Sequence, residues 1–232
     1  MLLPKPINEN VRDAQRRIDV AARVSGRTGP DVTIVAATKY LDVDATHQLL
    51  AAGIGTIGES RLDAMLAKQQ ALTDAMPARW HFIGPLQSRK AREVAAHVAC
   101  IETLCSESAA RKLAAWADEG NALPQMLVQV NTAADPAKDG ILPDALPAFL
   151  ASLPDQLSVD GLMTMPAFAA DAEASRPAFA QLRELAERNR EAYAGRHPLR
   201  ELSMGTSQDF DVAVEEGATL VRLGRILYAQ RE

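Results

Sequence analysis

Lys39 is the residue of this sequence that is best placed to do chemistry. It follows residues 32–38, whose apolar and β-branched side chains predict a buried strand of a parallel sheet. Ligands of α/β proteins bind beyond the carboxyl ends of such strands. Because side chains alternate along a strand, we expect Lys39 to share one face with Val35 and Ala37. Burial lowers the pKa of a lysine, and a neutral amine can form a Schiff base with a carbonyl. Alternatively, Lys39 only marks the point where the strand reaches solvent.

Two segments near the end of the chain suit a phosphate group. In residues 202–207 a strand pattern changes into the start of a helix, with hydroxyl side chains and Gly205 at the corner. A helix N-terminus offers free backbone N–H groups and the positive end of the helix dipole, which bind phosphate. Barrels often place such a site after strands seven and eight, and Gly224 would allow a close backbone approach there. Thr206 or Ser207 could instead be only a helix N-cap.

Arg222 lies in the last apolar run of the chain, residues 219–223. Val221 and Leu223 share the face that suits packing on helices, so Arg222 is expected to point the other way, into a barrel. A buried guanidinium needs a partner, because an unpaired buried charge is very costly. That partner could be Glu59 or another inward acid, or it could be the ring nitrogen of a bound cofactor. A Schiff-base lysine, a phosphate-binding turn and this arginine together suit pyridoxal phosphate.

The elements that must position these residues alternate between strand and helix patterns. Apolar residues at helical spacing predict an amphipathic helix from Ile7 to about Gly26, ahead of the first strand. The strands that follow are separated by helices, which implies a parallel sheet with right-handed crossovers. Eight such units in 232 residues favour a closed barrel. The predicted fold class is therefore α/β, a (β/α)8 TIM barrel with an extra N-terminal helix, and residues 1–232 are expected to form a single domain. The expected strands are residues 32–40, 56–59, 80–84, 98–103, 126–131, 159–164, 201–204 and 219–223.

Composition excludes several classes of partner. The net charge is −5, and acids and bases are mixed along the chain, so neither nucleic acid nor an anionic membrane is expected to bind. No apolar run reaches membrane length, and the start Met1-Leu2-Leu3-Pro4-Lys5 lacks the apolar core of a signal peptide. We therefore expect a cytoplasmic protein.

The histidines and cysteines predict neither a disulfide scaffold nor a metal site. They show no close ligand spacing along the chain, so a metal role could arise only through the fold. These residues are His47, His81, His97, His197, Cys100 and Cys105.

A set of short segments is shared with one known family. The segments are Val35-Ala36-Ala37-Thr38-Lys39, Gly58-Glu59, Trp80-His81-Phe82-Ile83-Gly84, Leu86-Gln87-Ser88, Val128-Gln129-Val130-Asn131, Gly161-Leu162-Met163-Thr164, Leu202-Ser203-Met204-Gly205, Asp209-Phe210 and Val221-Arg222-Leu223-Gly224. Through them the chain resembles the pyridoxal phosphate homeostasis protein family, which shares the barrel of the bacterial alanine racemase N-terminal domain. The resemblance spans about residues 7 to 230, in register throughout. The combined pattern is specific, although no single motif would be.

The resemblance implies that Lys39 binds pyridoxal phosphate as a Schiff base. It also implies that the protein buffers or delivers this cofactor inside the cell, with no established turnover. The chain departs from the family at Ser60, where asparagine is usual, and this change affects one polar contact near the cofactor. Further departures at Pro85, Arg89 and the ending Tyr228-Ala229 flank the pocket or face solvent.

Two enzymes are alternatives: a single-domain amino-acid racemase that uses pyridoxal phosphate, and a class I Schiff-base aldolase. A racemase needs two opposed acid/base groups, of which Lys39 could be one. Tyr40 follows Lys39 directly and is expected to point the other way, whereas Tyr193 and Tyr228 lie in helical or terminal segments. Arg222 is a permanent donor and cannot keep the cofactor ring protonated as a carboxylate would. The sequence therefore predicts a cofactor-binding protein without catalytic residues.

The predicted partners are pyridoxal phosphate and the apoenzymes that depend on it, and the chain is expected to be a monomer. The predicted cofactor-binding residues are Lys39, Ser203, Gly205, Ser207, Arg222, Gly224 and Arg225.

Overall fold

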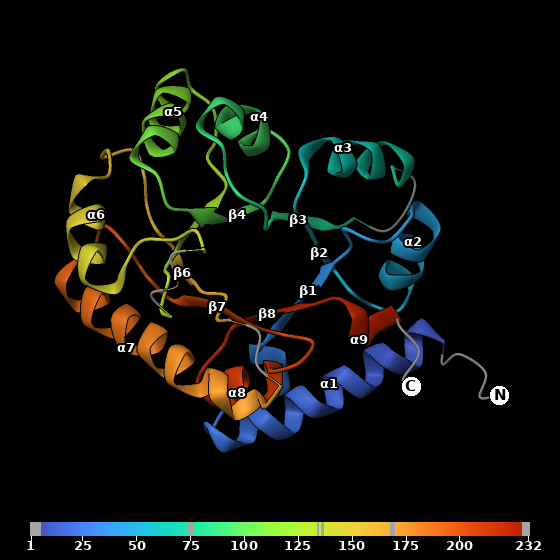
Figure 1. Ribbon diagram of the computed structural model, residues 1–232. Coiled ribbons are helices and arrows are strands. Elements are labelled where there is room, and N and C mark those ends of the chain that lie inside the picture. Colours follow the sequence, from blue (N-terminus) through green and yellow to red (C-terminus); the bar gives the residue numbers. More distant parts are fainter. Residues whose placement is uncertain (1–5, 74–76, 134, 136, 168–169, 229–232) are drawn as a thin grey trace.

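Eight parallel strands form a closed barrel in the computed structural model, as the sequence predicted (Figure 1). The structure describes residues 6–73, 77–133, 135, 137–167 and 170–228. Each strand pairs with the next along the chain, and the last strand closes the barrel against the first, with Val35 opposite Arg222. The strands are β1 (Thr33–Ala37), β2 (Thr56–Glu59), β3 (Arg79–Phe82), β4 (Cys100–Leu104), β5 (Gln125–Gln129), β6 (Gly161–Met163), β7 (Glu201–Thr206) and β8 (Leu220–Leu223).

Helices surround the barrel and bury its outer face. Asp42 and Ser106 cap two of them as side-chain acceptors, from Ala45 N at 2.8 Å and Ala109 N at 3.3 Å. The helices are α1 (Ile7–Val24), α2 (Val43–Ala51), α3 (Leu62–Ala71), α4 (Ala91–Ala95), α5 (Glu107–Asp118), α6 (Leu146–Ser152), α7 (Arg176–Ala192), α8 (Phe210–Glu215) and α9 (Arg225–Tyr228). None of the helices in the described ranges is long and apolar enough to cross a membrane.

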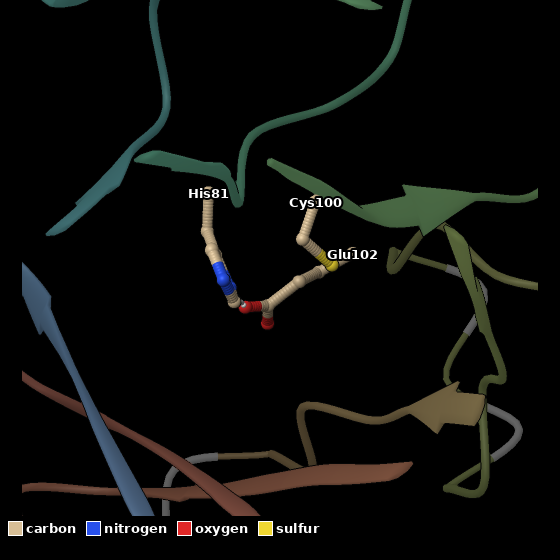
Figure 2. A group of neighbouring side chains, drawn as sticks. All are labelled: His81, Cys100 and Glu102. Atoms are coloured by element: carbon tan, nitrogen blue, oxygen red, sulfur yellow. Dashed lines mark hydrogen bonds and ion pairs between the residues drawn. The ribbon is translucent and has the colours of Figure 1, made fainter. Parts of the chain in front are cut away.

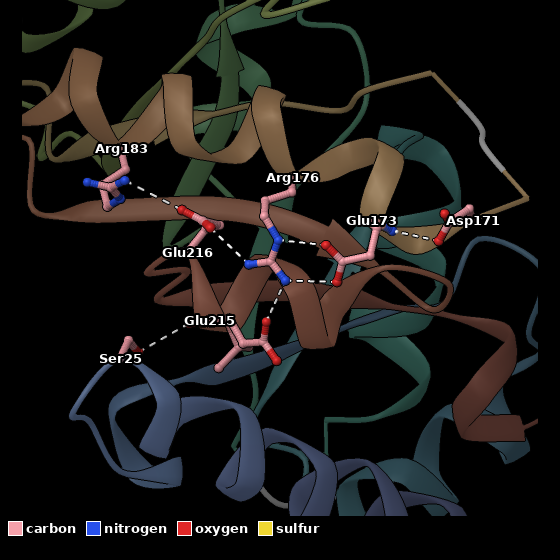
Figure 3. A network of polar contacts seen from close by, with 8 residues as sticks. Ser25, Asp171, Glu173, Arg176, Arg183, Glu215 and Glu216 are labelled. Atoms are coloured by element: carbon pink, nitrogen blue, oxygen red, sulfur yellow. Dashed lines mark hydrogen bonds and ion pairs between the residues drawn. The ribbon is translucent and has the colours of Figure 1, made fainter.

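The extra N-terminal helix is present, and it packs beside the last two helices (Figure 1). Asn10 on α1 donates to the carbonyl of Leu227 at 3.3 Å, and the Arg17 guanidinium lies 4.3 Å from the ring centre of Phe210. Farther along, Arg176 at the start of α7 contacts Glu215 and Glu216 at the end of α8 (Figure 3). The contacts of α1 join the beginning of the chain to its end, and the contacts of Arg176 join α7 to α8.

The apolar core has two parts. The larger part lies between the strands and the helices, as expected for outward-facing strand residues in a barrel. The smaller part fills the barrel interior and consists of Val35, Cys100, Leu127, Met163 and Leu220, with Ile83 beside them. Beyond this apolar layer, toward the carboxyl ends of the strands, the interior is lined by polar side chains that are capable of chemistry.

The first strand is shorter than the sequence predicted, and this changes the position of Lys39. The prediction of strand to residue 40 is wrong: β1 ends at Ala37, and Leu41 N donates to Thr38 O at 2.8 Å to make a turn. Lys39 lies in that turn and is exposed, so it does not share an inward face with Val35 and Ala37. The partner strand explains the early end, because the buried Thr38 hydroxyl donates to Glu59, the last residue of β2, at 2.7 Å.

The sequence between the strands predicts helices over residues 60–76, 87–97 and 143–153, and in the structure these helices are shorter or divided. Residues 87–97 form a 3₁₀ turn, η2 (Ser88–Lys90), followed by the short helix α4. Residues 143–153 likewise begin with a 3₁₀ turn, η3 (Pro143–Ala145), before α6. The helix expected over residues 60–76 ends at Ala71, and residues 74–76 lie outside the described part of the chain. The helix α9 was not predicted.

Candidate functional site

A buried ion pair holds the turn that carries Lys39. Glu59 at the end of β2 pairs with Lys68 of α3, and both side chains are at least nine-tenths buried. Lys68 Nζ also donates to Thr38 O at 2.6 Å. The residue before Lys39 is thus fixed through both its hydroxyl and its carbonyl, which directs Lys39 to the carboxyl end of the barrel. The sequence reasoning missed Lys68, whose helix gave no signal that distinguishes it from a solvent-facing lysine.

Arg222 lies inside the barrel, as its strand pattern predicted, and only 6% of it is exposed. Its guanidinium donates to the Ser203 hydroxyl and, at 2.7 Å, to the carbonyl of Thr164. The inward acid beside it is Glu102, at 3.8 Å, rather than Glu59, which is taken by Lys68. Burial lowers the pKa of Arg222, and the charge of Glu102 acts in the opposite direction.

Glu102 is the centre of this interior network. Its two carboxylate oxygens have different partners: Oε1 lies 2.7 Å from His81 Nδ1, and Oε2 accepts from the Ser203 hydroxyl at 2.6 Å. Burial alone would raise the pKa of Glu102. The hydrogen bonds from His81 and Ser203 and the charge of Arg222 outweigh this effect and hold the pKa below its ordinary value. A continuous polar chain therefore runs across the barrel from His81 to Arg222.

The loops after β7 and β8 meet at the carboxyl end of the barrel. Ser207 Oγ accepts from Gly224 N at 3.1 Å and from Ile226 N at 3.4 Å, so it lies at the start of α9. Arg225 in that helix is exposed. A Cβ atom added at Gly224 would lie 3.7 Å from Ala37 O, so this loop also borders the end of β1. Two backbone N–H groups, one hydroxyl and an arginine form a donor set that suits phosphate.

Gly205 has a packing role near the end of β7, just before the turn that leads to α8. Its φ of +90° is in the left-handed region, and an added Cβ would lie 2.5 Å from Ala213 Cβ and 2.9 Å from Phe210 Cα. Asp209 closes this turn by accepting from the backbone N–H of Thr206 at 2.7 Å and from its hydroxyl at 3.0 Å. The backbone of β7 can therefore approach α8 only without a side chain at this position.

A small cavity opens between the interior network and the loops. It has a volume of about 190 Å³, and both Arg222 and Lys138 line it. Pro85, one of the departures from the family pattern, borders the same cavity. Lys138 donates to the carbonyls of Met165 and Pro166 and so ties the loop after β5 to the loop after β6.

The seven predicted binding residues divide into two levels. Lys39, Ser207, Gly224 and Arg225 lie at the carboxyl end, just after β1, β7 and β8. Ser203 and Arg222 lie below them inside the barrel, bonded to each other, and Gly205 lies in β7 between the two levels. Ser203 is 0% exposed, and its hydroxyl is held by Glu102 and Arg222. Its contacts therefore hold Arg222 in place rather than reach the loops at the carboxyl end.

The expected orientation of Tyr40 is wrong. Lys39 Nζ lies 5.1 Å from the centre of the Tyr40 ring, because the two residues occupy a turn and no longer alternate along a strand. Tyr228 also lies at this end, since its hydroxyl would stand 3.6 Å from a Cβ added at Gly224. Burial raises the pKa of Tyr228. Tyr40 therefore lies beside the lysine, whereas Tyr228 lies against the loop of Gly224 at the same end of the barrel.

Comparison with known proteins places the chain in a family. Residues 12–232 match the family model of the alanine racemase N-terminal domain. A pyridoxal phosphate homeostasis protein of Pseudomonas aeruginosa is 36% identical over 229 residues, which cover 97% of this chain and 96% of the relative. A second protein of that name, from Aquifex aeolicus, is 33% identical over 97% of this chain and 98% of its own length.

Comparison with solved structures supports the relationship that the sequences show. PipY of Synechococcus elongatus with PLP bound has a TM-score of 0.80 and 32% identity, covering 96% of this chain and 100% of its own. The structure of PipY without PLP also has a TM-score of 0.80, with 34% identity, and the match covers 93% of this chain and 99% of the PipY chain. An alanine racemase of Clostridium difficile shares the fold, with a TM-score of 0.70 at 14% identity over 96% of this chain and 57% of its own. The full-length agreement in sequence and barrel shows that this chain belongs to the pyridoxal phosphate homeostasis protein family.

Proposed function

We propose that this protein binds pyridoxal 5′-phosphate covalently at Lys39 and buffers or delivers it within the cell. The observation that carries the proposal is the convergence of Lys39, the Ser207–Gly224 contact and the inward Arg222 at one end of the barrel. These residues match the three reactive parts of the cofactor: its aldehyde, its phosphate and its ring nitrogen. A homologous barrel of 32% identity binds PLP, which supports the same role here.

The residues present fit the cofactor. The backbone N–H groups of Gly224 and Ile226, the hydroxyl of Ser207 and the exposed Arg225 would hold the phosphate. Arg222 lines the neighbouring cavity and would face the ring nitrogen. The Thr38, Glu59 and Lys68 contacts would keep Lys39 at the carboxyl end.

The position of Arg222 also supports a protein that carries pyridoxal phosphate rather than one that uses it for catalysis. Bound pyridoxal phosphate supplies an electron sink for amino-acid chemistry, which is strongest when the ring nitrogen carries a proton. A guanidinium has no acceptor and does not give up its proton, so Arg222 can donate a hydrogen bond but cannot protonate the ring. Glu102 is the nearby acid, and its oxygens are held by His81 and Ser203 rather than directed into the cavity.

Reduction with borohydride tests the attachment. The protein loaded with pyridoxal phosphate is reduced, digested and mapped by mass spectrometry, and the adduct is expected on Lys39. Lys39→Ala should lose the adduct, whereas Lys138→Ala, which removes a lysine from the cavity lining at the same end, should keep it. An adduct on Lys68 or Lys138 in the wild type would overturn the proposal.

A racemase is the second candidate, because Tyr40 lies beside Lys39 and Tyr228 lies against the loop of Gly224 at the same end of the barrel. Loaded wild-type protein is incubated with L-alanine and assayed for D-alanine and pyruvate. We expect no turnover above that of free pyridoxal phosphate. Sustained turnover that is lost in Tyr40→Phe or Tyr228→Phe would establish the racemase instead. The aldolase alternative would be established if the protein cleaved a sugar phosphate without added pyridoxal phosphate.

A further inference from the structure

Three potential metal ligands meet inside the barrel, at the His81 end of the polar chain that runs to Arg222 (Figure 2). His81 comes from β3, and Cys100 and Glu102 come from inward positions two residues apart on β4. All three side chains are buried, and one ligand atom from each lies within 4.8 Å of the others. The chain spacing gave no sign of this group, because His81 is brought to the other two only when β3 pairs with β4.

The donor set is that of a zinc site. Imidazole nitrogen, cysteine sulfur and carboxylate oxygen are the three protein ligands of Zn²⁺, at bond lengths of about 2.0–2.3 Å. Tetrahedral geometry at these lengths separates ligand atoms by roughly 3.2–3.8 Å. The present separations bracket this range: the group spans up to 4.8 Å, whereas His81 Nδ1 and Glu102 Oε1 are 2.7 Å apart. Small side-chain rotations would therefore admit an ion.

We propose that His81, Cys100 and Glu102 form a binding site for Zn²⁺ in the barrel interior, with water as the fourth ligand. The ion would replace the hydrogen bond between His81 and Glu102 Oε1, and the proton on His81 Nδ1 would leave to solvent, so that a neutral ring with its proton on Nε2 binds the ion. The ion would also displace the thiol proton of Cys100, which is released to solvent. The proposal does not depend on the function proposed above.

The ion has a route to the site from the amino-terminal end of the barrel. A cavity of about 200 Å³ opens there, and His81 and Cys100 are part of its lining. Its other lining residues include Glu201, whose charge favours a cation, and Arg79, whose charge opposes one. The cavity has room for the water that completes the coordination. Lys39 lies at the opposite end of the barrel, so zinc and cofactor would enter from different sides.

The two oxygens of Glu102 allow the site to form without loss of the Arg222 network. Oε1 faces His81 and would bind the ion, whereas Oε2 accepts from Ser203, which in turn accepts from Arg222. Carboxylates that bind metals are commonly held by such outer hydrogen bonds, which fix the orientation of the ligand. Ser203 and Arg222 would thus be the outer support of the metal site.

Metal titration of the full-length protein tests the site. Protein stripped of metal by a chelator is titrated with Zn²⁺ in competition with a colorimetric indicator, and then separately with Co²⁺. We expect one Zn²⁺ per chain. Co²⁺ should give the near-ultraviolet charge-transfer band of a thiolate ligand and the visible bands of a tetrahedral ion.

Cysteine variants locate the ion. Cys100→Ala removes one ligand with little change in volume, and Cys105→Ala is the matched control, because Cys105 lies outside the group. Loss of an outer ligand support typically costs 10–100-fold in affinity, so loss of the direct ligand Cys100 should cost about a hundredfold or more. Circular dichroism verifies that both variants are folded. Absence of stoichiometric Zn²⁺ in the wild type, a Co²⁺ spectrum without the thiolate band, or equal losses in the two variants would overturn the proposal.

Discussion

Individual side chains at the carboxyl end of the barrel have separable tasks. Lys39 is exposed and offers the amine, whereas the neighbouring Thr38 is buried and fixes the backbone. Ser207 joins the loops after β7 and β8, and Ser203 holds Arg222 inside the barrel. The two serines lie only four positions apart in the sequence, yet Ser207 contacts the loop after β8, whereas Ser203 lies inside the barrel against Glu102 and Arg222.

The first prediction distinguishes these serines. Ser207→Ala should weaken the binding of pyridoxal phosphate much more than the binding of pyridoxal, because only the former has the phosphate. A hydrogen bond to a charged group is worth roughly 1.5–3 kcal/mol, so the loss should be about tenfold to a hundredfold. Dissociation constants of the two ligands, measured by absorbance, provide the comparison.

Ser203→Ala serves as the matched control. It should lower the affinities of both ligands by similar factors, since its hydroxyl contacts Glu102 and Arg222 rather than the loops. Equal losses for both ligands in Ser207→Ala would show that Ser207 is only a helix cap, as the alternative interpretation of the sequence allows.

At the scale of elements, close packing of β7 on α8 decides the shape of the site. Gly205 is the contact point, and the turn after it places Ser207 against the start of α9. The short β1 has a comparable effect, because its early end places Lys39 in a turn beside the loop of Gly224.

The second prediction tests this packing. Gly205→Ala should lower the free energy of unfolding by roughly 2–4 kcal/mol, since it adds both backbone strain and a clash with Ala213 and Phe210. Gly120→Ala is the control: its φ of +88° is similar, but an added Cβ meets nothing within 4 Å, so its cost should be only about 1–2 kcal/mol. Urea unfolding measures both. Equal costs would mean that the β7–α8 contact relaxes freely.

At the scale of the whole molecule, contacts between segments that are far apart in the sequence hold neighbouring units of the barrel together. His197 is one such link, since it is fully buried before β7 and accepts from Val159 N at 3.2 Å through Nδ1, while Nε2 lies 3.3 Å from Leu150 O. These contacts need a neutral ring with its proton on Nε2. Burial lowers the pKa of His197 from 6.5.

The third prediction concerns pH. Because the folded pKa of His197 is below 6.5, the unfolded chain takes up a proton first as the pH falls. The stabilisation from neutral His197 is thus complete above pH 6.5 and is lost as the pH falls through the folded pKa. His197→Asn keeps an acceptor near the position of Nδ1 but does not titrate. Urea unfolding between pH 7.5 and 5 should show a steeper loss of stability in the wild type than in His197→Asn, and parallel curves would contradict the assignment.

The sequence by itself determined the architecture and selected the candidate ligand residues. Alternating strand and helix patterns are local, so they predicted the eight strands, the closed barrel and the inward direction of Arg222. Lys39 and the paired loops after β7 and β8 could be selected because strand ends in a barrel converge on one face.

Only the tertiary structure decided which buried polar groups are partners. The exposed Lys39, the buried Lys68 and the contact between Lys39 and Tyr40 depend on where β2 and α3 meet the end of β1. His81, Cys100 and Glu102 come together through the pairing of β3 with β4, and Ser203 and Arg222 join them from the opposite wall of the barrel. Local periodicity indicates which face a residue occupies but not its neighbour across the interior, because that neighbour is set by strand register and by closure of the sheet.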